Sequence, residues 1–207
     1  PCESSCVLSL NDEPVTIRQN ELSIIEKGFC EDYVKPRIPE KRTGKKVAVI
    51  GGGPAGLACA DLLNQAGHTV TVYEAEDQMG GYLRFGIPDF KLDKSIIDRR
   101  LRILEQEGIL FRTGVNVGRE ADISKIRSEN DALCLAIGAR KTRDLKIKGR
   151  ELGNVYFALE YLSQQNRVVR GDKIAEKDLI NAYNRNVVVI GGGDTGSDCV
   201  GSANRQQ

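Results

Sequence analysis

The chain has 207 residues, of which 40% are hydrophobic and 29% are charged, and its formal net charge is +1. This length suffices for one or two small domains with a real core, and the composition is ordinary for a globular protein. The near-neutral charge gives no reason to expect nucleic acid or an anionic membrane as a partner. No apolar run approaches the ~20 residues that span a bilayer, and no signal peptide is evident, so we expect a cytoplasmic protein.

The segment before residue 45 predicts one short helix followed by a linker. In TIRQNELSIIEKGFCE, residues 16–31, the side chains of Leu22, Ile25 and Phe29 would share one face of a helix. The next stretch, DYVKPRIPEKRTGKK, contains two prolines, a glycine and six basic residues, a composition typical of a solvated connection. We therefore place a domain boundary between residues 44 and 45.

From residue 46 onward, apolar strand patterns alternate with amphipathic helix patterns. One helix is predicted at residues 93–108, where Asp93 is the expected N-cap and Gly108 the expected stop. Alternation at this spacing indicates an α/β fold with a parallel sheet. The other predicted helices lie at residues 56–67 and 155–166, and the predicted strands lie at residues 46–51, 68–75, 109–115, 131–139 and 186–191.

The stretch VAVIGGGPAGLACADLLNQAGHTVTVYEAE contains the motif G-x-G-x-x-G at Gly51, Gly53 and Gly56. Between a strand and a helix, these glycines allow a tight turn, close approach of a pyrophosphate and close packing of the helix on the sheet. Glu74 ends the next predicted strand, where a carboxylate can accept hydrogen bonds from ribose hydroxyls. The alternative, a glycine-rich turn that binds nothing, is the weaker interpretation because this context is complete.

A second glycine motif, VVVIGGGDTGSDC, places Gly191, Gly193 and Gly196 after another predicted strand. No second strand with a ribose-facing acid follows this copy within the chain, and Asp194 is an unusual neighbour for a diphosphate. Two such turns on one chain favour two dinucleotides, a flavin and a nicotinamide, that exchange a hydride.

Cys2 and Cys6 form a C-x₃-C pair in PCESSC. In a chain without secretory features this spacing suggests metal or cluster ligation more than a disulfide, but two ligands cannot hold a cluster. Two exposed thiols are an equally good interpretation of the spacing alone. Three further cysteines lie inside apolar segments and are expected to pack as small hydrophobic side chains: Cys59, Cys134 and Cys199.

Three stretches together are more specific than these general patterns: PCESSCVLSLNDEPVTI, GGYLRFGIPDFKLDK and GGGDTGSDCVGSANRQ. With them the chain closely resembles, over essentially its whole length, the small (beta) subunit family of glutamate synthase. That family is related to the N-terminal half of dihydropyrimidine dehydrogenase and to NADPH–ferredoxin oxidoreductase subunits.

The resemblance implies a Rossmann-like, two-dinucleotide-binding flavoprotein preceded by the end of a helical iron–sulfur domain. It assigns residues 1–44 to the iron–sulfur domain and linker, residues 45–139 to the FAD-binding domain, and residues 140–207 to the start of the NAD(P)H-binding domain. In such an enzyme NADPH gives a hydride to FAD, and electrons pass through 4Fe–4S clusters to the large (alpha) subunit, which makes glutamate. We expect the chain to be truncated at both ends and inactive in isolation.

The resemblance also implies roles for individual residues. The FAD pyrophosphate would contact Gly51, Gly53, Pro54, Ala55 and Gly56, and Glu74 would hold the ribose. The flavin side would involve Gly81, Tyr82 and Leu83, with Lys91 as a polar contact. Gly138 would be a cofactor contact in the strand-end motif where the chain crosses between the two domains. NADPH would face Gly192, Gly193, Asp194 and Thr195. Cluster ligands would be Cys2, Cys6 and Glu21, although a solvated helical carboxylate is the better interpretation of Glu21.

Two alternative functions remain open from the sequence. An enzyme of the same superfamily could pass its electrons to ferredoxin or to a pyrimidine-reducing domain instead of the large subunit. A non-catalytic nucleotide-binding remnant is the other alternative, and the intact glycines and Glu74 argue against it. The choice of NADPH over NADH rests on the resemblance alone.

Overall fold

The computed structural model describes residues 2–206, which form two compact units that divide between Arg37 and Ile38. The domain limits expected at residues 44 and 139 stay predictions. Among the described residues, none of the helices is long and apolar enough to cross a membrane.

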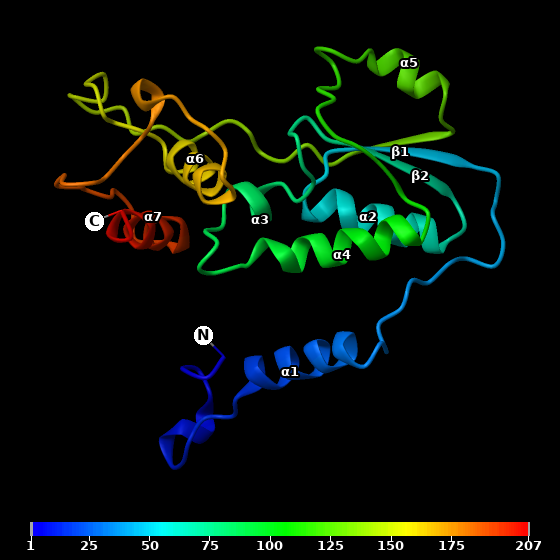
Figure 1. Cartoon of the computed structure of the whole chain (residues 1–207), viewed down its shortest axis with the longest axis horizontal. Helices are drawn as coiled ribbons and strands as arrows, with labels where there is room; N and C mark the ends of the chain where they lie inside the picture. The colour runs from blue at the N-terminus through cyan, green and yellow to red at the C-terminus, as the bar shows by residue number, and fades with distance from the viewer. Residues whose placement is uncertain (1, 207) are drawn as a thin grey trace. The chain divides into compact units, whose positions relative to one another are not determined.

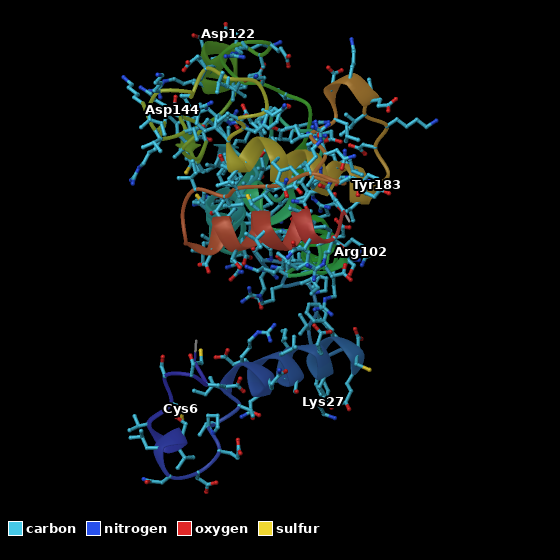
Figure 2. The ribbon with its side chains drawn as sticks, turned by 90° about the vertical axis from the view of Figure 1, so that its left-hand side faces the viewer. Cys6, Lys27, Arg102, Asp122, Asp144 and Tyr183 are labelled. Carbon is cyan, nitrogen blue, oxygen red and sulfur yellow. The ribbon has the colours of Figure 1, made fainter. Side chains whose placement is uncertain are left out.

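The N-terminal unit contains a 3-10 turn, η1 (Val7–Leu10), and one long helix, α1 (Ile17–Cys30). The helix predicted in this region is therefore confirmed. No residue of α1 is buried, and Leu22 and Ile25 on its expected apolar face remain 40% and 43% exposed. Figure 2 shows the side chains of this helix, Lys27 among them, projecting outward from its axis.

The second unit is built on a four-stranded parallel sheet in the order β3-β2-β1-β4. The central strand β1 is buried from its second residue onward, as its continuous apolar sequence requires. Four of the five predicted strands are thereby confirmed. Their bounds are β1 (Lys46–Ile50), β2 (Thr69–Tyr73), β3 (Leu110–Arg112) and β4 (Ala132–Leu135).

Helices cover both faces of this sheet (Figure 1). On one face α2 (Pro54–Gln65) and α4 (Lys94–Gln106) enclose a core of small and branched side chains. On the other face α5 (Ile123–Ser128) places Ile126 against two residues of β1. The expected N-cap is confirmed, because the Asp93 carboxylate accepts a hydrogen bond of 2.8 Å from the Ser95 amide.

The remaining elements form a second layer beside the sheet. The short helix α3 (Tyr82–Phe85) contacts α6 (Ala158–Arg170), and α6 packs against α7 (Asp194–Asn204) through Tyr161, Leu162 and Cys199. A 3-10 turn, η2 (Glu176–Asp178), lies between α6 and α7 in the chain. Figure 1 shows α6 and α7 next to each other.

The strand predicted at residues 186–191 is not formed, so that prediction was wrong. The segment forms no ladder with any described residue, and Val187, Val188 and Ile190 are 50%, 86% and 73% exposed. A strand is stabilised by hydrogen bonds to a neighbour and by burial of its faces. The apolar, β-branched composition alone supplies neither.

Candidate dinucleotide-binding site

The first glycine motif forms the turn that joins strand β1 to helix α2. Gly51 has a φ of +110°, and a Cβ there would lie 2.2 Å from the carbonyl oxygen of Ala136. A Cβ on Gly56 would lie 1.9 Å from the carbonyl oxygen of Gly51. Both contacts are with backbone atoms that cannot swing away, so a side chain at either position would displace the turn.

The middle glycine of the motif faces another glycine across a narrow gap. The nearest atom to a Cβ built on Gly53 is the Cα of Gly81, at 3.8 Å, which is an ordinary van der Waals contact, so a methyl group would fit there without displacing the turn. Gly81 has a φ of +51°, and a Cβ there would approach the Cα of Gly53 to 2.8 Å. Gly53 is also the N-cap of α2, and it has no side chain with which to cap the helix. The first amides of α2 are therefore available to an anion such as a pyrophosphate.

Two further predicted contacts lie in the first turn of α2. Pro54 occupies the first helical position, which needs no amide hydrogen, and Ala55 follows it. Both residues are exposed. Of the predicted pyrophosphate-binding residues, Pro54 and Ala55 are therefore exposed at the start of α2, Gly51 and Gly53 are half-buried, and Gly56 is buried against the turn.

Glu74 lies at the end of β2 and is 5% exposed. Its Oε2 accepts a hydrogen bond of 2.7 Å from the Gly52 amide, and its Oε1 accepts one of 2.9 Å from the Glu76 amide. The buried carboxylate is thus stabilised by backbone donors and joins the end of β2 to the glycine turn. The guanidinium of Arg140 lies 3.9 Å from Oε1. The role of Glu74 in holding a ribose stays a prediction.

The segment that follows β2 folds back over the first glycine turn. The Gly80 amide donates to the Gly52 carbonyl at 2.8 Å, and the Tyr82 hydroxyl donates to the Ala139 carbonyl at 3.4 Å. Arg84, which is 5% exposed, donates from Nε to the Met79 carbonyl at 2.6 Å. These contacts bring the predicted flavin-side segment and the loop after β4 to one edge of the sheet. Of the predicted cofactor contacts in these two segments, Leu83 is half-buried and Gly138 is exposed.

The second glycine motif repeats the backbone geometry of the first. Gly191 has a φ of +119°, and a Cβ on Gly196 would lie 2.4 Å from the Gly191 carbonyl oxygen. Gly193 is the N-cap of α7, as Gly53 is of α2. The residues predicted to face NADPH are all exposed: Gly192, Gly193, Asp194 and Thr195. The close approach of Gly196 to the Gly191 carbonyl does not depend on strand pairing. The turn is therefore formed although residues 186–191 are not in a sheet.

Lys91 is the predicted flavin contact that lies elsewhere. Its ammonium forms an ion pair with Asp198 of α7, and the neighbouring Phe90 ring also contacts this helix. The structure therefore connects this part of the motif GGYLRFGIPDFKLDK to the second glycine turn. Its proposed contact with the flavin stays a prediction.

The described residues do not assemble a cluster site. Cys2 is exposed, Cys6 is half-buried and Glu21 is exposed on α1. Within residues 2–206 there is no group of three His, Cys, Asp or Glu side chains that could hold a metal ion. A 4Fe–4S cluster is held by four thiolates, so the two cysteines here do not by themselves fit the group. Their ligation roles, and that of Glu21, stay predictions.

Sequence reasoning missed the residues that attach α6 to α3 and to the loop after β2. Arg167 donates to Glu76 at 2.8 Å and lies 4.8 Å above the Phe85 ring, and Arg170 pairs with Asp77 at 2.7 Å. The helix predicted at residues 155–166 ends before these two residues, whereas α6 extends to Arg170. Basic residues in the last turn of a helix also look like ordinary charges that complement the helix dipole, so no local signal marks them. Together with Arg84 they line a cavity of about 210 Å³.

The basic linker also contains a structural residue that the sequence did not reveal. Arg42 donates to the side-chain oxygen of Asn64 at 2.6 Å, to the His68 carbonyl at 2.8 Å and to the Glu107 carbonyl at 3.1 Å. These acceptors follow α2 and α4 or lie within them. The connection before β1 is therefore fixed to the helical layer at this point.

Comparison with known proteins agrees with this geometry. The family model described as pyridine nucleotide-disulphide oxidoreductase matches residues 21–125 and 45–207. The NADPH glutamate synthase small chain of Mycobacterium tuberculosis is 54% identical, covering 100% of this chain and 43% of that protein. The corresponding small chain of Bacillus subtilis is 49% identical, covering 100% of this chain and 42% of that protein.

Among solved structures, FprA of Mycobacterium tuberculosis in complex with NADPH matches 59% of this chain and 29% of its own, with 26% identity and a TM-score of 0.54. The resemblance to glutamate synthase small chains and the α/β fold are thus confirmed. The chain spans less than half the length of the small chains that it matches. By the match of the family model, this chain belongs to the pyridine nucleotide-disulphide oxidoreductases.

Proposed function

We propose that this chain provides the FAD-binding turn and the beginning of the NADPH-binding fold of a glutamate synthase small subunit, the electron-input component. The observation that carries the proposal is the repeated glycine turn. In both copies the last glycine approaches the carbonyl of the first, at 1.9 Å for a Cβ on Gly56 and 2.4 Å for one on Gly196. Two turns of this kind suit two dinucleotides.

The residues of the first turn fit FAD. A Cβ on Gly53 would contact only the Cα of Gly81, at 3.8 Å, so these two glycines let the facing loop lie close with no side chain of their own over the start of α2. The buried Glu74 carboxylate holds the turn in place by accepting a hydrogen bond from the Gly52 amide. Bound FAD would supply the chemistry that accepts a hydride from a nicotinamide and releases electrons singly.

This chain contributes by positioning the two cofactors. Hydride transfer needs no nucleophile and base, because the two cofactors react once they are held in contact. The exposed amides at the start of α2 and α7 bind the two pyrophosphates, and the segment 79–85 covers the first turn. The names of the relatives support NADPH as the donor and a large subunit as the partner. Transfer of electrons through 4Fe–4S clusters and a cytoplasmic location belong to the same proposal.

The proposal is tested by the visible absorption of the purified protein after incubation with excess FAD and desalting. We expect a retained flavin band that Gly53→Ala weakens. The matched control is Gly153→Ala, because a Cβ at Gly153 meets no atom within 4 Å. A colourless wild-type protein would contradict an FAD site at the first turn.

The second step uses a full-length small subunit that contains this chain, because the chain spans less than half the length of the small chains that it matches, and adds NADPH under anaerobic conditions. Bleaching of the flavin band by NADPH is expected for the electron-input role. A protein that retains FAD but is bleached by dithionite and not by NADPH would contradict the proposed donor. Addition of the purified large subunit with glutamine and 2-oxoglutarate then tests the partner, by formation of glutamate.

A further inference from the structure

The loop between α3 and α4 contacts α7 with two consecutive side chains, Phe90 and Lys91. The Lys91 ammonium pairs with the carboxylate of Asp198, which is 7% exposed. Within residues 2–206 no hydrogen-bond donor meets Oδ1 of Asp198 at bonding geometry, so the charge of Lys91 is what compensates this buried oxygen. A buried carboxylate without a partner is unfavourable, and the pair therefore favours one position of α7 against the loop.

Phe90 adds a steric contact with α7. A Cβ built on Gly201 would lie 2.8 Å from Cζ of the Phe90 ring, so the ring occupies the space that any side chain at that position would need. The guanidinium carbon of Arg205 lies 3.7 Å from the centroid of the same ring, and Arg205 also donates to the Gly201 carbonyl at 2.9 Å. A glycine inside a helix is unfavourable relative to alanine. The close approach of the Phe90 ring explains why a glycine occupies position 201.

The loop that presents these two side chains is itself fixed. The Lys94 ammonium donates to the Ile87 carbonyl at 2.7 Å and to the Leu92 carbonyl at 2.8 Å, which lie on the two sides of Phe90 and Lys91 in the chain. The same loop continues from α3, whose Gly81 faces Gly53 of the first glycine turn. A short, rigid path therefore runs from the first turn to α7.

The second glycine turn depends on such contacts. Residues 186–191 make no ladder with the described residues, so no sheet holds the start of α7. Packing against α6 attaches α7 on another side, and α6 is tied to the loop after β2 by Arg167 and Glu76. With α6 as its only attachment, α7 could rotate relative to the sheet. The second attachment, through Asp198 and Lys91, restricts this rotation.

We infer that Phe90, Lys91, Asp198 and Gly201 form a clamp that holds the second glycine turn at a set position relative to the first, and that Lys91 and Asp198 are positioning residues for hydride transfer between the two bound dinucleotides. This inference rests on the proposed function. In this role the Lys91 ammonium is engaged by Asp198 in place of the flavin contact that the resemblance implies, so the clamp acts through α7 and governs the rate of transfer more than the affinity for either nucleotide.

The test compares Lys91→Ala and Gly201→Ala with a control, Lys45→Ala. The control removes another lysine–aspartate ion pair, Lys45 to Asp131 at 2.8 Å, which joins the starts of β1 and β4 away from both turns. The first measurement is amide hydrogen exchange. We expect residues 191–204 to exchange roughly threefold to tenfold faster in both clamp variants, with α2 unchanged. Lys91→Arg keeps the charge and is expected to exchange like the wild type.

The second measurement is the rate of flavin reduction by NADPH in the FAD-loaded full-length small subunit that carries each substitution. The limiting rate is expected to fall about tenfold to a hundredfold in Lys91→Ala. The NADPH concentration that gives half of this rate should stay within about twofold, because the clamp does not contact the nucleotide. Lys91→Arg should recover most of the limiting rate.

Failure of the clamp and failure of the proposed function give different results. If the wild-type protein binds no FAD, the proposed function fails, and hydrogen exchange still decides whether the clamp exists. If the wild type reduces its flavin with NADPH and Lys91→Ala matches it in both exchange and limiting rate, the clamp is wrong. A variant that loses FAD or NADPH affinity instead of rate would also overturn a positioning role.

Discussion

The amide of Gly52 donates a hydrogen bond of 2.7 Å to Oε2 of Glu74, so the first glycine turn is tied directly to the acid at the end of the neighbouring strand. Sequence reasoning assigns Glu74 to the ribose and the glycines on either side of Gly52, Gly51 and Gly53, to the pyrophosphate. In the structure the same carboxylate also orders the turn. Loss of Glu74 would therefore disturb both the ribose contact and the pyrophosphate cradle.

Glu74→Gln is expected to destabilise the fold as well as weaken FAD retention. An amide group has one acceptor oxygen, so its NH₂ would face either the Gly52 or the Glu76 amide. We expect a loss of about 1–3 kcal/mol in the free energy of unfolding, measured with urea. Glu129→Gln, at an exposed position after α5, is the control. Equal stability of the two variants would show that the carboxylate does not order the turn.

Substitutions at two glycines of the first motif should separate folding from binding. Gly56→Ala places a methyl group against the Gly51 carbonyl, and overpacking of this kind costs about 1–3 kcal/mol. Gly53→Ala meets only Gly81, at 3.8 Å, so stability should change by less than about 1 kcal/mol while FAD affinity falls. Urea unfolding and flavin titration measure the two effects. If both variants lose stability equally, the space at Gly53 is not an open cradle.

Arg42→Ala is expected to destabilise the sheet domain although it lies in a linker sequence. The substitution leaves the Asn64 side chain, which is buried, and the Glu107 carbonyl without this donor. We expect a loss of about 1–3 kcal/mol in thermal or urea unfolding. Lys41→Ala tests an adjacent exposed basic residue and should stay within about 0.5 kcal/mol of the wild type. Similar losses in both would contradict a specific role for Arg42.

The attachment of α6 to the loop after β2 should weaken in acid. Burial raises the pKa of Asp77, but the hydrogen bond and charge of Arg170, together with the charge of Arg167, hold that pKa below its ordinary value of 3.8. A carboxyl whose folded pKa is depressed stabilises the fold above its unfolded value and loses this contribution as the pH falls through the folded value.

The stabilising contribution of Asp77 is therefore present above its ordinary pKa of 3.8 and is lost as the pH falls from that value through the lower pKa of the folded state. Hydrogen exchange or thermal unfolding between about pH 2 and about pH 6 would measure this loss. Asp77→Asn should show a flatter dependence over the same interval. An unchanged slope in this variant would show that other carboxyls govern the acid response.

Local patterns in the sequence were enough for the central part of the fold. Four strands and the helices α2, α4 and α6 were predicted because apolar periodicity, the Asp93 cap and terminal glycines act within a few residues of each other. The first glycine turn was also predictable, since its glycines are required by contacts inside one strand–turn–helix unit. The short helices α3 and α5 were missed, because four or six residues carry too little periodicity.

By itself, then, the sequence determined the parallel α/β architecture, the two glycine turns and the position of Glu74, all of which follow from local chemistry and spacing. The tertiary structure alone decided that residues 186–191 form no strand, that Lys91 pairs with Asp198, and that Arg42 ties the linker to the helical layer. These outcomes depend on which distant segments meet. An isolated lysine, arginine or apolar run carries no mark of its partner, because the energy that selects the partner arises only when the chain has folded.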